Sequence, residues 1–327
     1  MSLPKHQLGN TGLEVSVLSY GASALGAVFD ENMDVEEGIA SVHEALKLGI
    51  NLFDTSPFYG ITKSETVLGR ALASVPRSEY ILSSKCGRYG EDTFDFSAER
   101  VTSSIQESLD RLGVEHIDLI HCHDMEFVNL DQIVNETLPA LKKLKEKGVI
   151  RFIGISGLPL KIFRNVLDKV EPGSVDVILT YCHSTLFDNA LAEFIPYLES
   201  KGVGVINAAA LSMGLLSPQG APSWHPASQD VKDACQKAAS ICKAAGVSLP
   251  KLAIKHSISC PGIATTLLSM PTRAQVRENV NGVLEAFDLV PVNTDLKAKQ
   301  DACLAEIKQL FAPVMNSTWS SGLPENN

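Results

Sequence analysis

The feature that most constrains this chain is a strand-like segment followed by a helix-like segment, a pairing that recurs eight times between Leu18 and Glu285. Several strand-like segments are nearly continuous apolar runs, which is typical of parallel strands buried on both faces. They are Leu18–Ala22, Asn51–Thr55, Tyr80–Lys85, Ile117–His123, Phe152–Ser156, Val175–Tyr181, Val203–Ala208 and Gly262–Leu268.

The helix-like segments alternate with these strands, and glycines follow several of them, where a left-handed helix end costs least. They are Val35–Leu48, Ser64–Ser74, Ala98–Leu112, Leu130–Lys147, Leu160–Lys169, Asn189–Ser200, Gln229–Ala245 and Arg273–Glu285. Eight such pairs predict an α/β fold of the (β/α)₈-barrel (TIM barrel) type. A doubly wound sheet is the structural rival, but no G-x-G-x-x-G pattern follows the first strand.

We expect a single domain over residues 1–327, with the barrel at about 17–286 and a C-terminal extension over 287–327. The turn signal Gly9-Asn10-Thr11-Gly12 predicts an N-terminal hairpin over Leu8–Leu18. The Pro- and Gly-rich stretch Leu215–Ser228 reads as a long loop near the ligand face, and Asn293–Leu310 as a helix in the extension.

The formal net charge of −10 argues against a nucleic-acid partner and against a polybasic membrane anchor. Residues Met1 to Leu8 contain no apolar core of a signal peptide, and no apolar run is long enough to cross a membrane. We therefore expect a cytoplasmic protein that is a monomer or weak dimer and acts on a small molecule.

Four chemically active side chains stand at or just beyond the ends of consecutive predicted strands: Asp54, Tyr59, Lys85 and His123. In a (β/α)₈ barrel the carboxyl ends of the strands carry the chemistry, so we expect these groups to converge. His121 and His123 point to the same face of a strand, but the sequence supplies no third ligand, and we predict no metal site.

With these residues in place, the sequence resembles the aldo-keto reductase family from Leu8 to about Glu285. The resemblance is carried by Gly21-Ala22-Ser23, Asn51 through Gly60, Lys85, Ile117-Asp118-Leu119 with His123, Phe152 through Ser156, and Gln275 through Asn279. It implies that Asp54, Tyr59, Lys85 and His123 are a catalytic tetrad. His123 fits better than His121 because it stands five residues after Asp118, as in the family.

The expected chemistry follows from the residue types. A free tyrosine has a pKa near ~10, and a neighbouring ammonium such as Lys85 favours the phenolate and lowers that pKa. Asp54 would hold Lys85, His123 would hydrogen-bond the substrate oxygen, and Tyr59 would transfer the proton. The hydride belongs to a nicotinamide cofactor.

The resemblance also implies cofactor contacts. The candidates are Gly21, Ala22, Ser23, Asp54, Ser156, Leu211, Gly214, Ser269, Gln275, Glu278 and Asn279. Relatives that prefer NADP place Lys and Arg where this chain has Ser269 and Gln275, so we expect NAD, with NADP as the alternative if Arg273 or Arg277 substitutes.

Further segments resemble plant dehydrogenases of this family that oxidise the anomeric hydroxyl of a free sugar to a lactone. They include 54–60, 84–89, 94–100, 121–124, 224–228 and 318–322. The predicted substrate contacts are Phe58, Tyr59, Arg88, His121, His123, Asp124 and Phe187. The chain departs from the family pattern at Ala209-Ala210-Leu211, at Ser269 and at Ser184–Phe187.

Three functions compete at this point. The leading hypothesis is NAD-dependent oxidation of an L-galactose-like sugar. The second is a diverged plant reductase that uses NADPH on a bulkier ketone or aldehyde of specialised metabolism, since the departure at Ser184–Phe187 makes the cleft more apolar. The third is a regulatory or channel-associated subunit that binds nicotinamide without turnover, and the intact tetrad argues against it.

Overall fold

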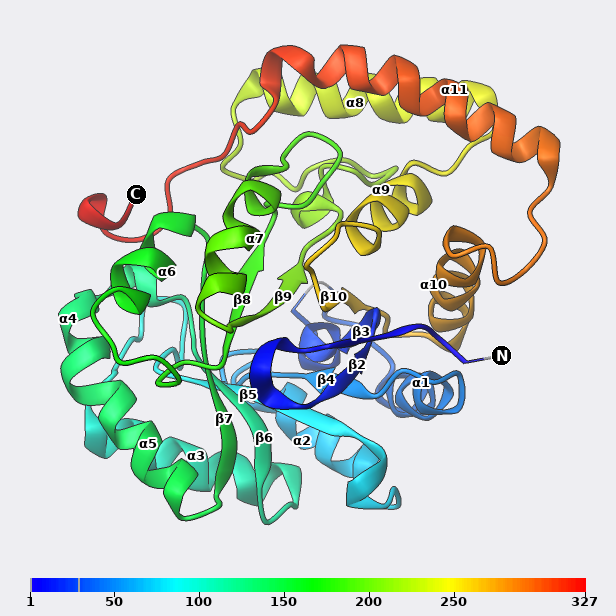
Figure 1. Cartoon of the computed structure of the whole chain (residues 1–327). Coiled ribbons are helices and arrows are strands. Elements are labelled where there is room, and N and C mark those ends of the chain that lie inside the picture. The colour runs from blue at the N-terminus through cyan, green and yellow to red at the C-terminus, as the bar shows by residue number, and fades with distance from the viewer. Residues whose placement is uncertain (1, 29) are drawn as a thin grey trace.

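The computed structural model, which describes residues 2–28 and 30–327, is a closed barrel of eight parallel strands surrounded by helices (Figure 1). The strand order is β10-β3-β4-β5-β6-β7-β8-β9. The strands are β3 Leu18–Gly21, β4 Leu52–Asp54, β5 Ile81–Cys86, β6 Ile117–Cys122, β7 Ile150–Gly157, β8 Val177–Tyr181, β9 Gly204–Ala208 and β10 Thr265–Ser269. The predicted barrel is confirmed.

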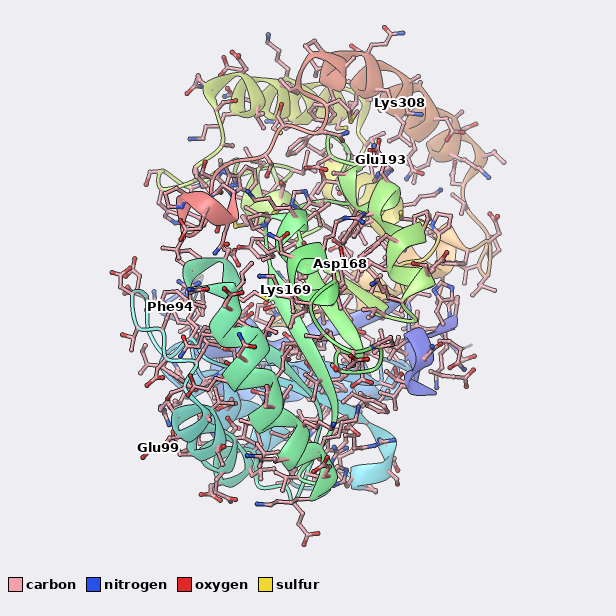
Figure 2. The ribbon with its side chains drawn as sticks, turned by 60° about the vertical axis from the view of Figure 1, so that its left-hand side comes forward. Phe94, Glu99, Asp168, Lys169, Glu193 and Lys308 are labelled. Carbon is pink, nitrogen blue, oxygen red and sulfur yellow. The ribbon has the colours of Figure 1, made fainter. Side chains whose placement is uncertain are left out.

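Helices follow the strands and cover the outside of the barrel. They are α1 Val35–Lys47, α2 Lys63–Leu72, α3 Ala98–Leu112, α4 Leu130–Gln132, α5 Leu138–Glu146, α6 Leu160–Leu167, α7 Ala190–Ser200, α8 Gln229–Ala245, α9 Leu249–Ile258, α10 Arg273–Ala286 and α11 Thr294–Phe311. A π-helical turn over Ile133–Thr137 joins α4 to α5. Charged side chains such as Glu99, Lys169 and Glu193 project from the helical layer into solvent (Figure 2).

An antiparallel hairpin of β1 (Lys5–Gln7) and β2 (Glu14–Ser16) precedes the barrel, as predicted. Its turn lies against the start of β9, where the Asn10 amide donates to the Gly202 carbonyl at 3.1 Å. A Cβ on Gly9 would lie 2.3 Å from the Gly204 amide nitrogen, so this approach requires glycine. Leu8, Leu13 and Val15 join the apolar residues inside the barrel and close its amino-terminal end.

One helix assignment was wrong. The helix between β9 and β10 that covers the barrel is α9, a segment that the sequence analysis did not predict as helical. Helix α8, which we expected in that position, instead packs lengthwise against α11 of the C-terminal extension (Figure 1). Ser248 caps α9 by accepting from the Lys251 amide, and Pro250 occupies its first turn, where proline is tolerated.

Helices α8 and α11 share a second apolar core with α9 and the loop before α8, which includes Leu216, Val231, Leu252, Ile307 and Phe311. Residues 215–228 form a loop, as expected, and α11 closely matches the helix predicted over 293–310. Within the described part of the chain, no helix is both long and apolar enough to cross a membrane.

Candidate active site

Asp54 and Lys85 form a buried ion pair at the carboxyl ends of β4 and β5. The Lys85 Nζ donates to Asp54 Oδ1 at 2.5 Å and to the Thr55 carbonyl at 2.9 Å. The other carboxylate oxygen of Asp54 accepts from the Ser83 hydroxyl at 2.7 Å. Burial lowers the pKa of Lys85, but Asp54 and Tyr59 outweigh it and the net pKa is raised. The ammonium therefore stays charged and fixed in position.

Tyr59 stands on the loop after β4, with its ring beside Lys85. The ammonium lies 4.9 Å from the ring centroid. This loop passes very close to the loop after β3. A Cβ on Gly60 would lie only 2.0 Å from the Gly26 carbonyl oxygen. This approach, with Gly60 at φ 61°, makes glycine necessary immediately after the tyrosine.

The pKa of Tyr59 departs from the sequence-based expectation. Removal of water from the phenol raises its pKa, Lys85 lowers it, and Asp54 and Asp124 raise it again, so that the net pKa is raised. The predicted direction of the Lys85 effect is right, but the predicted net decrease was wrong. The phenol of the free protein is protonated at neutral pH.

His123 follows β6, and its ring meets the Tyr59 ring edge-on, with centroids 5.6 Å apart. Its Nδ1 lies 3.0 Å from the Ser56 hydroxyl and its Nε2 lies 3.6 Å from Asp124 Oδ2. Burial, followed by the charges of Lys85 and Arg88, holds its pKa well below the usual value, so the imidazole is neutral. The structure thus brings all four predicted tetrad residues together.

Arg88 and Asp124, both predicted substrate residues, pair with each other beside His123. The Arg88 Nη1 donates to Asp124 Oδ2 at 2.5 Å, and its guanidinium lies over the Phe58 ring at 4.0 Å. Phe94, which Figure 2 labels, and Phe127 flank the same guanidinium. The other Arg88 nitrogens donate to the carbonyls of Gly90 and Glu91, so most of its donors are already used.

The remaining predicted substrate residues lie deeper. His121 is fully buried, and neither of its ring nitrogens has a hydrogen-bond partner within residues 2–28 and 30–327. A Cβ on Gly154 would lie 2.1 Å from its Nδ1. Phe187 is 1% exposed and packs against Phe311 in the α8–α11 core. Its side chain stabilises that core instead of forming an open wall of the cleft.

Two neighbours of the tetrad were missed by the sequence analysis. Ser56 has no signature of its own between Asp54 and Tyr59. Glu126, just beyond β6, is fully buried, and burial, followed by the Asp124 charge, raises its pKa to about 8. Its Oε1 accepts from the Leu158 amide and from Ser321 of the C-terminal tail, 195 residues away, so no local pattern could reveal the contact.

The first group of predicted cofactor residues lies at the ends of neighbouring strands. Gly21 ends β3 and Ser269 ends β10, and the two are paired in register. The Ser269 hydroxyl donates to the Gly21 carbonyl, accepts from the Ala24 amide and lies 3.2 Å from the Ser23 hydroxyl. Ala22 is buried at the start of the same turn.

The second group follows β9. Four residues between 209 and 214 have positive φ, namely Ala209 (54°), Ser212 (50°), Met213 (51°) and Gly214 (102°). The Ser212 hydroxyl is buried without a partner among the described residues. The amides of Ser212, Gly214, Leu215 and Leu216 already donate to carbonyls inside this segment. Leu211 lies within it, and its contact with the phosphates of a dinucleotide stays a prediction.

The third group is the start of α10. Gln275 is exposed, and its side-chain oxygen accepts from the hydroxyl of Thr272, which caps the helix. Glu278 forms an ion pair with Lys251 at 3.4 Å. Asn279 follows it in the helix. The two arginines of this turn are engaged by carboxylates of α1: Arg273 with Glu37 at 2.8 Å and Arg277 with Glu44 at 2.7 Å.

Ser156, the last predicted cofactor residue, holds the start of the loop that follows β6. It is buried at the end of β7, donates to the Cys122 carbonyl at 3.1 Å and accepts from the Asp124 amide at 3.3 Å. Over the described residues, no three His, Cys, Asp or Glu side chains are grouped to hold a metal ion.

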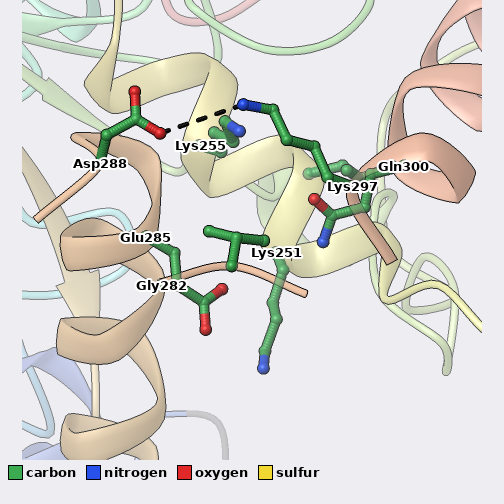
Figure 3. Close-up of a pocket in the computed structure, with 9 residues that line it drawn as sticks. Lys251, Lys255, Gly282, Glu285, Asp288, Lys297 and Gln300 are labelled. Atoms are coloured by element: carbon green, nitrogen blue, oxygen red, sulfur yellow. Dashed lines mark ion pairs between the residues drawn. The ribbon is translucent and has the colours of Figure 1, made fainter. Parts of the chain in front are cut away.

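A separate pocket lies between α9, α10 and the start of α11 (Figure 3). Its walls include Lys251, Lys255 and Lys297 together with Glu285 and Asp288. Lys297 reaches Asp288 at 4.0 Å. None of the tetrad residues lines this pocket, and its mixed charges do not favour one sign of ligand.

The comparisons with known proteins agree with the geometry. A model of the aldo/keto reductase family matches residues 17–293. The chain is 52% identical to the L-galactose dehydrogenase of Arabidopsis thaliana over 321 residues, 98% of each chain. It is 33% identical to the D-arabinose 1-dehydrogenase of Saccharomyces cerevisiae, covering 91% of this chain and 92% of the yeast protein.

A solved structure shows the same fold. The holo form of an aldo-keto reductase from Bacillus halodurans superposes with a TM-score of 0.73 at 24% identity, over 98% of each chain. The predicted resemblance to the aldo-keto reductase family, and within it to a plant L-galactose dehydrogenase, is confirmed.

Proposed function

The chain belongs to the aldo/keto reductase family, whose members are oxidoreductases that use nicotinamide cofactors, and from this premise we propose that it oxidises a free sugar at the anomeric hydroxyl. The product is the lactone, the acceptor is NAD, and the preferred sugar has the configuration of L-galactose near the anomeric carbon. The observation that carries the proposal is the 52% identity to the Arabidopsis enzyme over nearly the whole of both chains.

The tetrad supplies the proton chemistry of this reaction. A bound nicotinamide would supply the hydride chemistry, as the acceptor of the anomeric hydrogen with its electron pair. The hydroxyl proton passes to the Tyr59 phenolate, which Lys85 stabilises while Asp54 holds Lys85 in place. His123 donates a hydrogen bond to the substrate oxygen as it becomes a carbonyl. Tyr59 then returns its proton to solvent.

The residues present fit a dinucleotide. The turn with positive φ at 209–214 and the unpartnered Ser212 hydroxyl would receive the phosphates. The loop after β3 and the residue Ser269 would lie beside the cofactor, and the first turns of α10 would receive the adenosine. These contacts are predictions carried from the family pattern.

The preference for NAD is supported by charge. A 2′-phosphate needs cations that are free to pair with it. Gln275 is neutral, Arg273 already pairs with Glu37, and Arg277 already pairs with Glu44. The 2′-phosphate of NADP would have to displace one of these carboxylates.

A panel of aldoses, sugar alcohols and bulky ketones, followed by NADH or NADPH absorbance, tests the proposal. We expect L-galactose to reduce NAD with steady turnover, whereas a single stoichiometric burst would indicate a regulatory subunit. Tyr59→Phe should abolish turnover and leave NAD affinity unchanged, because only the transferable proton is lost. Tyr197→Phe, which removes a surface hydroxyl bonded to Asp168, is the matched control and should be fully active.

One observation favours the second function, reduction of a bulkier carbonyl with NADPH. The guanidinium of Arg88 is surrounded by Phe58, Phe94 and Phe127, and most of its donors are engaged within the protein, which leaves an aromatic wall near the tetrad. Rapid reduction of a hydrophobic ketone, with no aldose oxidised, would replace the sugar proposal.

A further inference from the structure

We propose that Ser56 is a positioning residue that fixes the tautomer of His123, so that Nε2 carries the ring proton and donates it to the substrate oxygen. The inference deepens the function proposed above and rests on it for its role in catalysis. The tautomer itself is a property of the protein alone and can be measured without substrate.

Ser56 is fully buried two residues after Asp54 and three before Tyr59. Its hydroxyl lies 3.0 Å from His123 Nδ1 and accepts from the Phe58 amide at 3.1 Å. No other hydrogen-bond partner of this hydroxyl is found among the described residues. The serine therefore links the tyrosine loop directly to the ring of the histidine.

A neutral imidazole carries one ring proton, so the hydroxyl and the ring have two possible arrangements. In the first, Ser56 accepts from Phe58 and donates its own hydrogen to Nδ1, which leaves the ring proton on Nε2. In the second, Nδ1 donates to Ser56, and the serine hydrogen is left buried without an acceptor. An unsatisfied buried donor is strongly disfavoured, so the first arrangement is stable.

The other side of the ring leads to the same tautomer. Asp124 Oδ2 lies 3.6 Å from His123 Nε2. A proton on Nε2 faces this carboxylate favourably, whereas a bare nitrogen lone pair would repel it. Lys85 and Arg88 also face the ring, and together with burial they keep the imidazole neutral, so that the tautomer and not the charge decides which nitrogen donates.

The tautomer matters because the reacting oxygen becomes a carbonyl and offers only lone pairs. With its proton on Nε2, His123 donates to this oxygen, while Tyr59 takes the hydroxyl proton. With its proton on Nδ1, the same ring would present a lone pair to the oxygen and oppose the reaction.

Nitrogen-15 NMR of histidine-labelled protein tests the tautomer directly. His123 is assigned among the eight histidines by the signals that disappear in His123→Gln. In the native protein we expect a protonated Nε2 and a bare Nδ1. In Ser56→Ala we expect a mixture of tautomers, because only the longer contact with Asp124, at 3.6 Å, then favours the proton on Nε2. A native protein with the proton on Nδ1 would overturn the proposal even if the variant failed to fold, and so would an unchanged tautomer in a folded Ser56→Ala.

Kinetics give a second readout. Ser56→Ala should lower kcat for the sugar about tenfold, because the donating tautomer is then less populated, with little change in NAD affinity. Ser41→Ala removes another buried serine hydroxyl, bonded to Tyr20, and should change neither measurement. Absence of sugar turnover would defeat the proposed function and leave the NMR result standing; an Nδ1 tautomer in an active enzyme would defeat only the inference about Ser56.

Discussion

Replacing Lys85 with methionine should destabilise the protein far more than replacement of an exposed lysine. The side chains of Lys85 and Asp54 are 1% and 3% exposed, so the ion pair has almost no contact with water. Methionine fills a similar volume, but among the described residues it leaves the Asp54 carboxylate with a single side-chain donor, the Ser83 hydroxyl.

The expected cost follows from that leftover charge. Breaking a buried pair by removing one partner costs about 3–5 kcal/mol, against a total stability of about 5–15 kcal/mol for a folded protein. Removing both charges is much less costly, so Asp54→Asn combined with Lys85→Met should recover most of the loss. Both the single and the double variant should be inactive, because each lacks Lys85. A difference in stability between them is therefore independent of catalytic activity.

Urea unfolding followed by circular dichroism measures these differences. Lys145→Met is the matched control, because it breaks a pair with Asp176 in which the lysine side chain is 32% exposed. That change should cost no more than about 1 kcal/mol. The reasoning is refuted if Lys85→Met is no less stable than the control, or if the double variant is as unstable as the single one.

Three further predictions concern the site. The pKa of Tyr59 is raised, and oxidation of the sugar needs the Tyr59 phenolate. The value of kcat/KM for sugar oxidation should therefore rise as the pH increases from neutrality toward that pKa. A rate that falls over this range would contradict the role of Tyr59 as base. Glu37→Gln should release Arg273 and improve NADP affinity while leaving NAD affinity unchanged, which calorimetry with both cofactors measures; no gain for NADP would show that Arg273 does not reach the 2′-phosphate. Gly154→Ala should lower the free energy of unfolding by about 1–3 kcal/mol, because its Cβ would press on His121, and a fully stable variant would show that the ring can move aside.

The barrel and the tetrad could be predicted from the sequence because one constraint produces both. Parallel strands in a closed barrel bring their carboxyl ends to one face, so Asp54, Lys85 and His123 had to converge once the strands were identified. The apolar runs identified the strands because both faces of each are buried.

What could not be predicted depends on distant contacts or on burial. Helix α9 was missed, and α8 was placed in the ring, because the pairing of α8 with α11 joins segments that are far apart in the chain. The contact between Glu126 and Ser321 spans 195 residues. The net pKa of Tyr59 required the extent of its desolvation, which no neighbouring residue type reveals.

The pairing of α8 with α11 has a consequence for inheritance and engineering. One helix lies between β9 and α9, and the other follows the last barrel helix. Val231 and Cys235 from α8 nevertheless lie in the same apolar core as Ile307 and Phe311 from α11. They are a single module encoded in two separate stretches. Deleting one stretch would leave the other with an uncovered apolar face, so among relatives the two should be gained and lost together. A chimaera that borrows the loop after β9 from a relative must borrow that relative's C-terminal extension as well.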